Sequence, residues 1–169
     1  MTQIAIVYFS ANGHTQQVAE AVAHGAESVT GTHVSILPIV GSDIRDGRWK
    51  NEAITEALNA ADAIIFGTPT YMGGYAAQFK AFIDACGSIW FQQGWKDKVA
   101  AGFTHSLGLS GDKLNTLQGL MINAMQHGMI WVGTGVMPEG SLPENTNRLS
   151  SYSGAMAQSN MDQQQINEG

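Results

Sequence analysis

Three short segments of this chain combine hydroxyl side chains with glycine and carry almost no charge. They span residues 10–15, 68–74 and 104–112, and each follows a run of apolar residues. Glycine lets backbone N–H groups approach a ligand closely, and hydroxyl groups donate hydrogen bonds without adding charge. These segments therefore suit a ligand that carries a phosphate and a ring, provided that the fold brings them to one rim.

The first segment, Ser-Ala-Asn-Gly-His-Thr, leads into a helical pattern. The first N–H groups of a helix lack partners within it, and together with the helix dipole they favour an anion. The segment has no lysine, so it is not the G-x-x-x-x-G-K-[ST] loop of nucleoside triphosphatases, and no G-x-G-x-x-G fingerprint follows any strand. Neutral donors from Ser10, Asn12 and Thr15 therefore predict a monophosphate site. The alternative is that Ser10 and Asn12 only cap the helix.

The second and third segments offer surface for a ring. Residues 68–74 combine a rigid proline with two glycines, and Tyr71 and Met72 add flat or polarisable surface. Residues 104–112 would form the opposite wall. Each segment alone has the composition of an ordinary turn. Three such segments at one rim of the sheet favour a ligand that carries a phosphate and a ring.

Alternating strands and helices must position these segments. Apolar runs predict strands at residues 3–9, 33–38, 63–66, 99–104 and 129–132. Helical spacing predicts a helix that stops near Gly31, helices over 50–61 and 75–86, and one that Asp112 caps, with Leu114, Leu117, Met121 and Met125 inside. This alternation is typical of an α/β fold with a doubly wound, five-stranded parallel sheet and helices on both faces. Ligands of such sheets bind at the carboxyl ends of the strands, where the three segments lie.

The C-terminal part departs from this pattern. Residues 141–169 are rich in Ser, Asn and Gln, and they predict an irregular or partly disordered tail. No pattern for a further covering helix is present, so the final helix is missing and apolar sheet surface should be exposed. Either a partner subunit covers this surface or the chain is a truncated product.

Composition narrows the classes of function. The 169 residues contain 8 Lys and Arg against 14 Asp and Glu, a net charge of −6, which lacks the basic footprint of nucleic-acid binding. The longest apolar runs are far shorter than the roughly 20 residues of a membrane span. A single cysteine and the lack of a signal peptide indicate a cytoplasmic protein. No ligand-like spacing of His or Cys indicates a metal site.

Three motifs together resemble those of a known family. They read Tyr-Phe-Ser-Ala-Asn-Gly-His-Thr at 8–15, Ile-Ile-Phe-Gly-Thr-Pro-Thr-Tyr-Met-Gly at 64–73 and Gln-His-Gly-Met at 126–129. The combination resembles flavodoxin-like FMN proteins, in particular the NAD(P)H:quinone oxidoreductases also called tryptophan-repressor-binding proteins. The resemblance implies one flavodoxin-like domain over residues 1–169, a strand order of 2-1-3-4-5, and FMN as the cofactor.

The resemblance also implies roles for individual residues. His127 matches a family histidine that meets the flavin from a neighbouring part of the assembly or of the site, and Trp90 matches an aromatic residue at the substrate face of the ring. The alternative for Trp90 is surface or interface packing. The implied phosphate residues are Ser10, Ala11, Asn12, Gly13, His14 and Thr15. The implied isoalloxazine residues are Pro69, Thr70, Tyr71, Met72, Gly73, Thr104, His105 and Ser106.

The implied function is that of an FMN-dependent oxidoreductase. It would transfer two electrons from NAD(P)H, as NADH or NADPH, to a quinone-type acceptor, and it would work as a homodimer or homotetramer. The alternatives are a flavodoxin-type electron carrier and an FMN-binding regulatory or interaction protein, neither with its own substrate pocket. Electron carriers use acidic surface around the flavin. Asp112 is the only acidic residue in the three segments, which favours the oxidoreductase.

Overall fold

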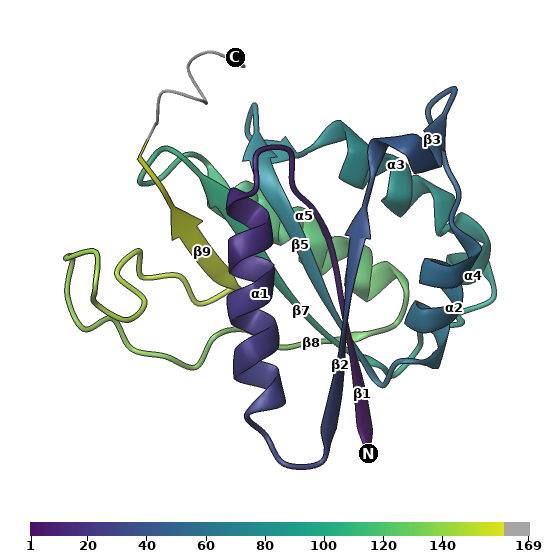
Figure 1. Cartoon of the computed structure of the whole chain (residues 1–169), viewed down its shortest axis with the longest axis horizontal. Helices are drawn as coiled ribbons and strands as arrows, with labels where there is room; N and C mark the ends of the chain where they lie inside the picture. Colours follow the sequence, from purple (N-terminus) through teal and green to yellow (C-terminus); the bar gives the residue numbers. More distant parts are fainter. Residues whose placement is uncertain (161–169) are drawn as a thin grey trace.

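A parallel sheet forms the centre of the structure, a computed structural model that describes residues 1–160 (Figure 1). In spatial order its strands are β2 (Thr32–Ile39), β1 (Thr2–Phe9), β5 (Ala63–Tyr71), β7 (Val99–Ser106) and β8 (Ile130–Trp131). All four pairings between these neighbours are parallel. The doubly wound α/β fold and its predicted strand order are therefore confirmed.

Helices lie on both faces of the sheet (Figure 1). Helix α1 (His14–Glu27) packs on one face, where Ala19 and Ala23 share a core cluster with Ile6, Tyr8 and Phe103. The other face carries α2 (Glu52–Ala60), α3 (Ala77–Ala85), α4 (Gly87–Phe91) and α5 (Lys113–Gln126), which enclose a larger core. No helix follows α5 within residues 1–160, and the rest of the expected tail, 161–169, lies outside the described residues.

Short elements connect these layers. The 3-10 helix η1 (Gly41–Asp43) and the hairpin of β3 (Ile44–Arg45) and β4 (Arg48–Trp49) join β2 to α2. Asn51 begins α2 as a true cap, because its side-chain Oδ1 accepts a hydrogen bond of 3.1 Å from the Ile54 N–H. Strand β6 (Gly74–Tyr75) folds back antiparallel on the end of β5.

Helix α5 is rotated relative to the sequence-based expectation. Leu114 and Met125, predicted to face the core, are 49% and 57% exposed, whereas Leu117 is buried as expected. The buried face of α5 consists of Lys113, Thr116, Leu117, Leu120, Asn123 and Ala124. Asp112 does not cap the helix, since its φ is +55° and its side chain accepts no capping hydrogen bond. Polar residues whose side chains have partners inside the protein occupy this face. Hydrophobic spacing alone therefore predicted that the wrong side chains of the helix are buried.

The fifth strand position is divided between two segments. Strand β8 pairs with Val99 and Ala100 at the start of β7, and β9 (Ala155–Gln158) pairs with residues 103–106 further along the same edge. Between them the chain makes an excursion over residues 132–154, which begins and ends at β7 (Figure 1). The prediction of an irregular tail is therefore wrong for β9. Its pairing partner lies some fifty positions earlier, and no local pattern reveals such a contact.

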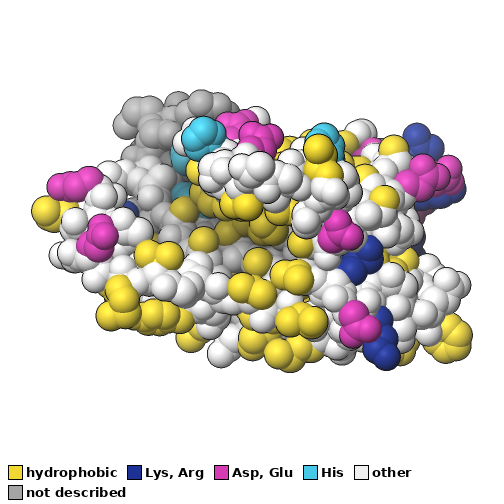
Figure 2. Space-filling model, turned by 90° about the horizontal axis from the view of Figure 1, so that it is seen from below, with side chains coloured by type: hydrophobic (Ala, Val, Ile, Leu, Met, Phe, Trp, Pro, Cys, Tyr) yellow, Lys and Arg dark blue, Asp and Glu magenta, His cyan; other side chains and the backbone are white. Residues whose placement is uncertain are grey.

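Apolar sheet surface is exposed near the start of β7, as the sequence predicted. Val99, Ile130 and Val132 are between 41% and 56% exposed. Figure 2, which views the molecule from below, shows hydrophobic side chains across the middle of this end, with most charged side chains toward its two sides. This surface lies at the opposite end of the strands from the three glycine- and hydroxyl-rich segments.

Candidate functional site

The three segments meet in one cavity at the carboxyl ends of β1, β5 and β7. Figure 1 shows that these strand ends lie at the same edge of the sheet. The cavity has a volume of about 370 Å³. Its lining contains no carboxylate within the described part of the chain. The lining residues are Ser10, Ala11, Asn12, His14, Thr15, Pro69, Thr70, Tyr71, His105, Ser106, Leu107, Gly108 and Gly111.

The first wall is the turn that leads from β1 into α1. Gly13 stands at the start of the helix with φ +83°, a left-handed conformation that suits glycine, and no side chain caps the helix. The first N–H groups of α1 are therefore not occupied by Ser10 or Asn12, contrary to the capping alternative. Ser10 Oγ is buried and has no hydrogen-bond partner among the described residues. A buried hydroxyl beside an uncapped helix start is an arrangement that suits a bound anion.

The second wall is the end of β5, which continues beyond the predicted boundary. Residues 68–71, predicted as a loop, extend the strand because they pair with β7 on one side and β6 on the other. Met72 and Gly73 form the tight turn, with φ of +48° and +81°, and the Met72 side chain points fully into solvent. Pro69, Thr70 and Tyr71 remain on the cavity lining.

A buried hydroxyl network supports this wall. Thr70 Oγ1 lies 2.8 Å from both Thr104 Oγ1 and Thr116 Oγ1. Thr104 in turn donates to the Thr68 carbonyl at 2.7 Å, and Thr68 Oγ1 accepts from the Ala76 N–H at 3.2 Å. The network links β5, β7 and α5, so it holds the floor of the cavity in place rather than offering free donors to a ligand.

The third wall starts at the end of β7 with a histidine pair. The rings of His14 and His105 stack with centroids 5.2 Å apart and an interplanar angle of 8°. His105 Nε2 also lies 2.9 Å from Ser159 Oγ. Burial, together with the nearby His14 and Lys113, lowers the pKa of His105 to about 4. At neutral pH His105 is therefore uncharged and provides a flat wall.

The structure brings together ten of the sixteen residues that the sequence singled out. On the lining are Ser10, Ala11, Asn12, His14, Thr15, Pro69, Thr70, Tyr71, His105 and Ser106. Off the lining are Gly13, Met72, Gly73, Thr104, Trp90 and His127. Gly13, Met72, Gly73 and Thr104 adjoin it, as turn or supporting residues. The sequence-based reasoning did not name Leu107, Gly108 and Gly111, although they belong to the third segment.

Trp90 and His127 line a different cavity. Its volume is about 310 Å³, and it lies beside the C-terminal end of α5, whereas the first cavity lies beyond the N-terminal end. A 14-residue helix is about 21 Å long, so the two residues are remote from the first cavity of their own chain. The His127 ring packs 4.6 Å from that of Trp95, its Nδ1 is buried without a partner among the described residues, and burial lowers its pKa.

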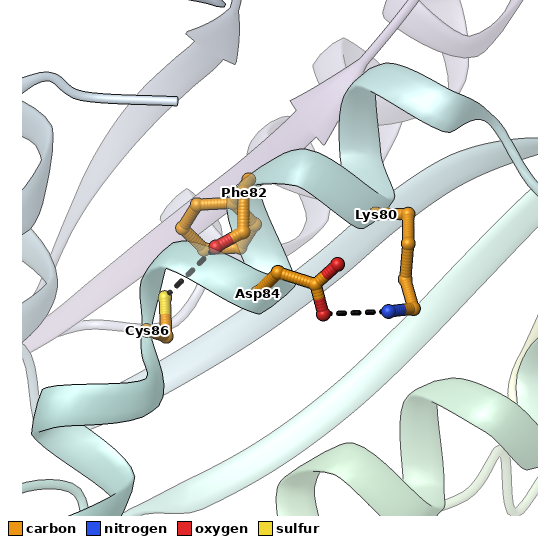
Figure 3. Close-up of polar contacts among 4 residues, drawn as sticks. All are labelled: Lys80, Phe82, Asp84 and Cys86. Atoms are coloured by element: carbon orange, nitrogen blue, oxygen red, sulfur yellow. Dashed lines mark hydrogen bonds and ion pairs between the residues drawn. The ribbon is translucent and has the colours of Figure 1, made fainter. Parts of the chain in front are cut away.

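The remaining candidate groups have structural roles. Cys86 lies at the junction of α3 and α4, where its thiol donates to the Phe82 carbonyl at 3.3 Å, beside the exposed ion pair of Lys80 and Asp84 (Figure 3). Burial raises the pKa of the thiol to about 12, so it is unreactive at neutral pH. Within residues 1–160 no three His, Cys, Asp or Glu side chains could share a metal ion, and no helix is long and apolar enough to cross a membrane.

Comparisons with known proteins agree with this architecture. The chain is 40% identical over 166 residues to flavodoxin FldP of Pseudomonas aeruginosa, covering 96% of this chain and 84% of that protein. It is 37% identical over 142 residues to an NAD(P)H dehydrogenase (quinone) of Sinorhizobium fredii, covering 79% and 71%. The crystal structure of a flavodoxin, WrbA-like protein from Agrobacterium tumefaciens is 44% identical, covers 98% of this chain and 88% of its own, and superposes with a TM-score of 0.73.

The family follows from a match that spans most of the chain. Residues 2–142 match the family model described as NADPH-dependent FMN reductase, and this range includes β1 to β8 and all three walls of the first cavity. The resemblance inferred from the three sequence motifs is thereby confirmed. The chain belongs to the NADPH-dependent FMN reductase family.

Proposed function

We propose that this protein is an FMN-dependent oxidoreductase that passes two electrons from NAD(P)H to a quinone-type acceptor. The observation that carries the proposal is the first wall of the cavity, where the uncapped start of α1 lies beside the buried, unpartnered Ser10 Oγ. These groups fit the phosphate of FMN, because they offer neutral donors and the positive end of a helix dipole. Similarity to the NAD(P)H dehydrogenase (quinone) relatives supports the choice of donor and acceptor.

The other walls fit the ring of the same cofactor. Tyr71 at the mouth and the neutral His105 provide flat surfaces, and Pro69 stiffens the backbone between them. Bound FMN would supply the redox chemistry, while the protein orients it and controls its surroundings. Ser10, Asn12 and Thr15 would hold the phosphate. The exposed side of the cavity would remain open for the nicotinamide and then for the quinone.

A flavodoxin-type electron carrier is the second candidate, because the similar Pseudomonas protein is named a flavodoxin. Carriers steer their redox partners by acidic surface around the flavin. The cavity lining of the described residues contains no carboxylate, and Asp112 is the nearest acidic residue of the third segment. This lack of acidic surface supports the oxidoreductase over the carrier. A cytoplasmic location is also part of the proposal, since the only cysteine is a buried thiol.

The experiment that separates these candidates is a reductive titration. The protein is reconstituted with FMN, titrated anaerobically with NADH and with NADPH, and then mixed with benzoquinone while the flavin absorbance is followed. Rapid bleaching by one nucleotide and recovery with benzoquinone is the expected result. Bound flavin that neither nucleotide reduces would contradict the oxidoreductase and favour the carrier.

The proposal includes a homodimer or homotetramer in which Trp90 of one copy reaches the flavin of another. It is supported by the position of Trp90 beside the far end of α5 and by the exposure of Trp90 and Phe91. His127 lines the same cavity but is 2% exposed, so in this assembly it would support the surface that Trp90 presents. A complementation experiment tests it, with one variant carrying Trp90→Ala and the other Ser10→Ala with Thr15→Ala. Mixed, refolded subunits should regain quinone reductase activity that neither variant has alone. A strictly monomeric protein in sedimentation would refute this assembly.

A further inference from the structure

Lys113 is fully buried at the first turn of α5, directly behind the third wall of the FMN cavity. Its ammonium group donates to Ser106 Oγ at 2.9 Å, to the Gly108 carbonyl at 2.5 Å and to the Leu109 carbonyl at 3.2 Å. The side chain has 0% relative exposure. All three N–H groups of the ammonium are therefore used, and all of them are used on the segment that closes the cavity.

Within residues 1–160, no carboxylate forms an ion pair with the ammonium group of Lys113. A buried ammonium group is normally paired with a carboxylate, because its removal from water costs several kcal/mol. The ion pairs among residues 1–160 are formed by other lysines, and Asp112, the next residue in the chain, is exposed. Burial lowers the pKa of Lys113, and the nearby guanidinium group of Arg148 lowers it further.

The loop is folded around this ammonium group. Gly111 and Asp112 both have φ of +55°, and a Cβ atom at Gly111 would lie 2.4 Å from Ser106 Oγ. The loop thus closes tightly on Lys113. From the other side, Gln158 of β9 donates to the Leu107 carbonyl at 2.9 Å and accepts from the Arg148 guanidinium at 2.5 Å. Two cations consequently stand behind a wall whose lining residues are uncharged.

We propose that Lys113 is a positioning residue that holds the third wall through Ser106 and whose positive charge, which no carboxylate of residues 1–160 pairs with, favours the reduced, anionic form of the bound flavin. This inference rests on the proposed function. Uptake of two electrons and one proton leaves the flavin ring with one additional negative charge. A cation in the low-dielectric interior attracts that charge much more strongly than a cation in water does. The oxidised ring is neutral and gains little from the same cation.

The test is Lys113→Gln, which removes the charge and keeps an amide that can donate to the loop. The dissociation constants of oxidised and reduced FMN and the two-electron reduction potential are measured anaerobically, with dithionite as reductant. We expect oxidised FMN to bind within about threefold of the wild type. Reduced FMN should bind about tenfold more weakly relative to the oxidised form, which corresponds to a potential about 30 mV lower.

Lys80→Gln is the matched control, because Lys80 is an exposed lysine of α3 (Figure 3) that does not belong to the lining of this cavity. The two-electron reduction potential of FMN bound to the Lys80→Gln variant should equal that of FMN bound to the wild type. If Lys113→Gln does not fold, Arg148→Gln tests the same charge effect at a half-buried position, and the potential should fall by a smaller amount. An unchanged potential in the folded Lys113→Gln variant, or in Arg148→Gln where that variant is needed, would overturn the proposal.

Two further outcomes are decisive. A folded Lys113→Gln protein that loses oxidised and reduced FMN equally would show a purely structural role and overturn the charge effect. Wild-type protein that binds FMN but is not reduced by NAD(P)H would refute the proposed oxidoreductase, while dithionite would still allow the potentials to be compared. Wild-type protein that binds no FMN at all would refute both proposals.

Discussion

At the scale of single residues, the hydroxyl groups of Ser10 and Thr15 decide the phosphate assignment. We expect Ser10→Ala combined with Thr15→Ala to weaken FMN binding by about 100-fold or more, since each of the two lost hydrogen bonds to an anion is worth about 1.5–3 kcal/mol. The fold should survive, because Ser10 Oγ has no partner within the described chain to lose. Quenching of FMN fluorescence measures the affinity. Ser35→Ala in β2, at a similarly half-buried serine, is the control, and an unchanged affinity in the double variant would refute the assignment.

His105 makes the stability of the protein depend on pH. Its pKa is about 4 in the folded chain against an ordinary value of 6.5, so between these values the unfolded chain binds more protons. Stability should therefore fall as the pH drops from about 6.5 toward 4, and His127, whose pKa burial also lowers, acts in the same direction. Urea denaturation should show that the free energy of unfolding falls less between pH 7 and pH 5 for His105→Asn than for the wild type. His24→Asn, at an exposed position, should lose as much stability between these pH values as the wild type. An equal loss of stability in the wild type and both variants would exclude His105 as the source of the pH dependence.

The residues that line the cavity could be predicted better than the residues that support it. Hydroxyls and glycines after apolar runs mark the carboxyl edge of a sheet, so Ser10, Thr15 and Tyr71 were identifiable from type and position alone. Lys113 was not, because lysine is rarely buried and its partners are a hydroxyl and backbone carbonyls that sequence does not distinguish. His127 shows the limit of motif matching, since the motif gives a role without a location.

At the scale of the elements, the close contact of β5 and β7 depends on Gly67. A Cβ atom there would lie 2.1 Å from Cζ of Phe103, whose ring is buried beneath α1. Gly67→Ala should therefore destabilise the protein by about 1–3 kcal/mol, the usual cost of overpacking. Gly25→Ala in α1 is the contrasting variant, because a Cβ there meets nothing within 4 Å and alanine favours the helix by up to about 1 kcal/mol. Urea denaturation of both variants checks this, and equal stabilities would show that the Phe103 ring can move aside.

Element type was predictable and element extent was not. Buried apolar runs identified the strands, but β5 runs on through Thr68 and Thr70 because neighbouring strands pair with these polar residues. Hydroxyl groups that find partners inside the protein behave as core residues, which a hydrophobic pattern cannot reveal. The same effect rotated α5, where Thr116 lies inside and Leu114 outside. Strand β9 depends on a distant partner and has no local pattern.

At the scale of the whole molecule, FMN should stabilise the native state by mass action. At a free concentration about one hundred times its dissociation constant, a ligand that binds only the folded chain adds about 2.7 kcal/mol to the free energy of unfolding. The melting temperature should rise accordingly with FMN. It should rise less with the same concentration of riboflavin, which lacks the phosphate that α1 and Ser10 would hold. A melting temperature that does not respond to FMN would contradict specific binding.

The division of the last strand position between β8 and β9 makes the segment between these strands a place where the protein can be engineered. The excursion of residues 132–154 leaves and rejoins the sheet along one edge, and its two ends are tied together where Thr134 donates to the Ser151 carbonyl and Trp131 to the Ser153 carbonyl. Residues that it carries back, Arg148 and Gln158, act on the third wall and not on the phosphate-binding turn. Grafting a different excursion between β8 and β9 should thus alter the support of the third wall through the loss of Arg148, while the phosphate-binding turn keeps its structure.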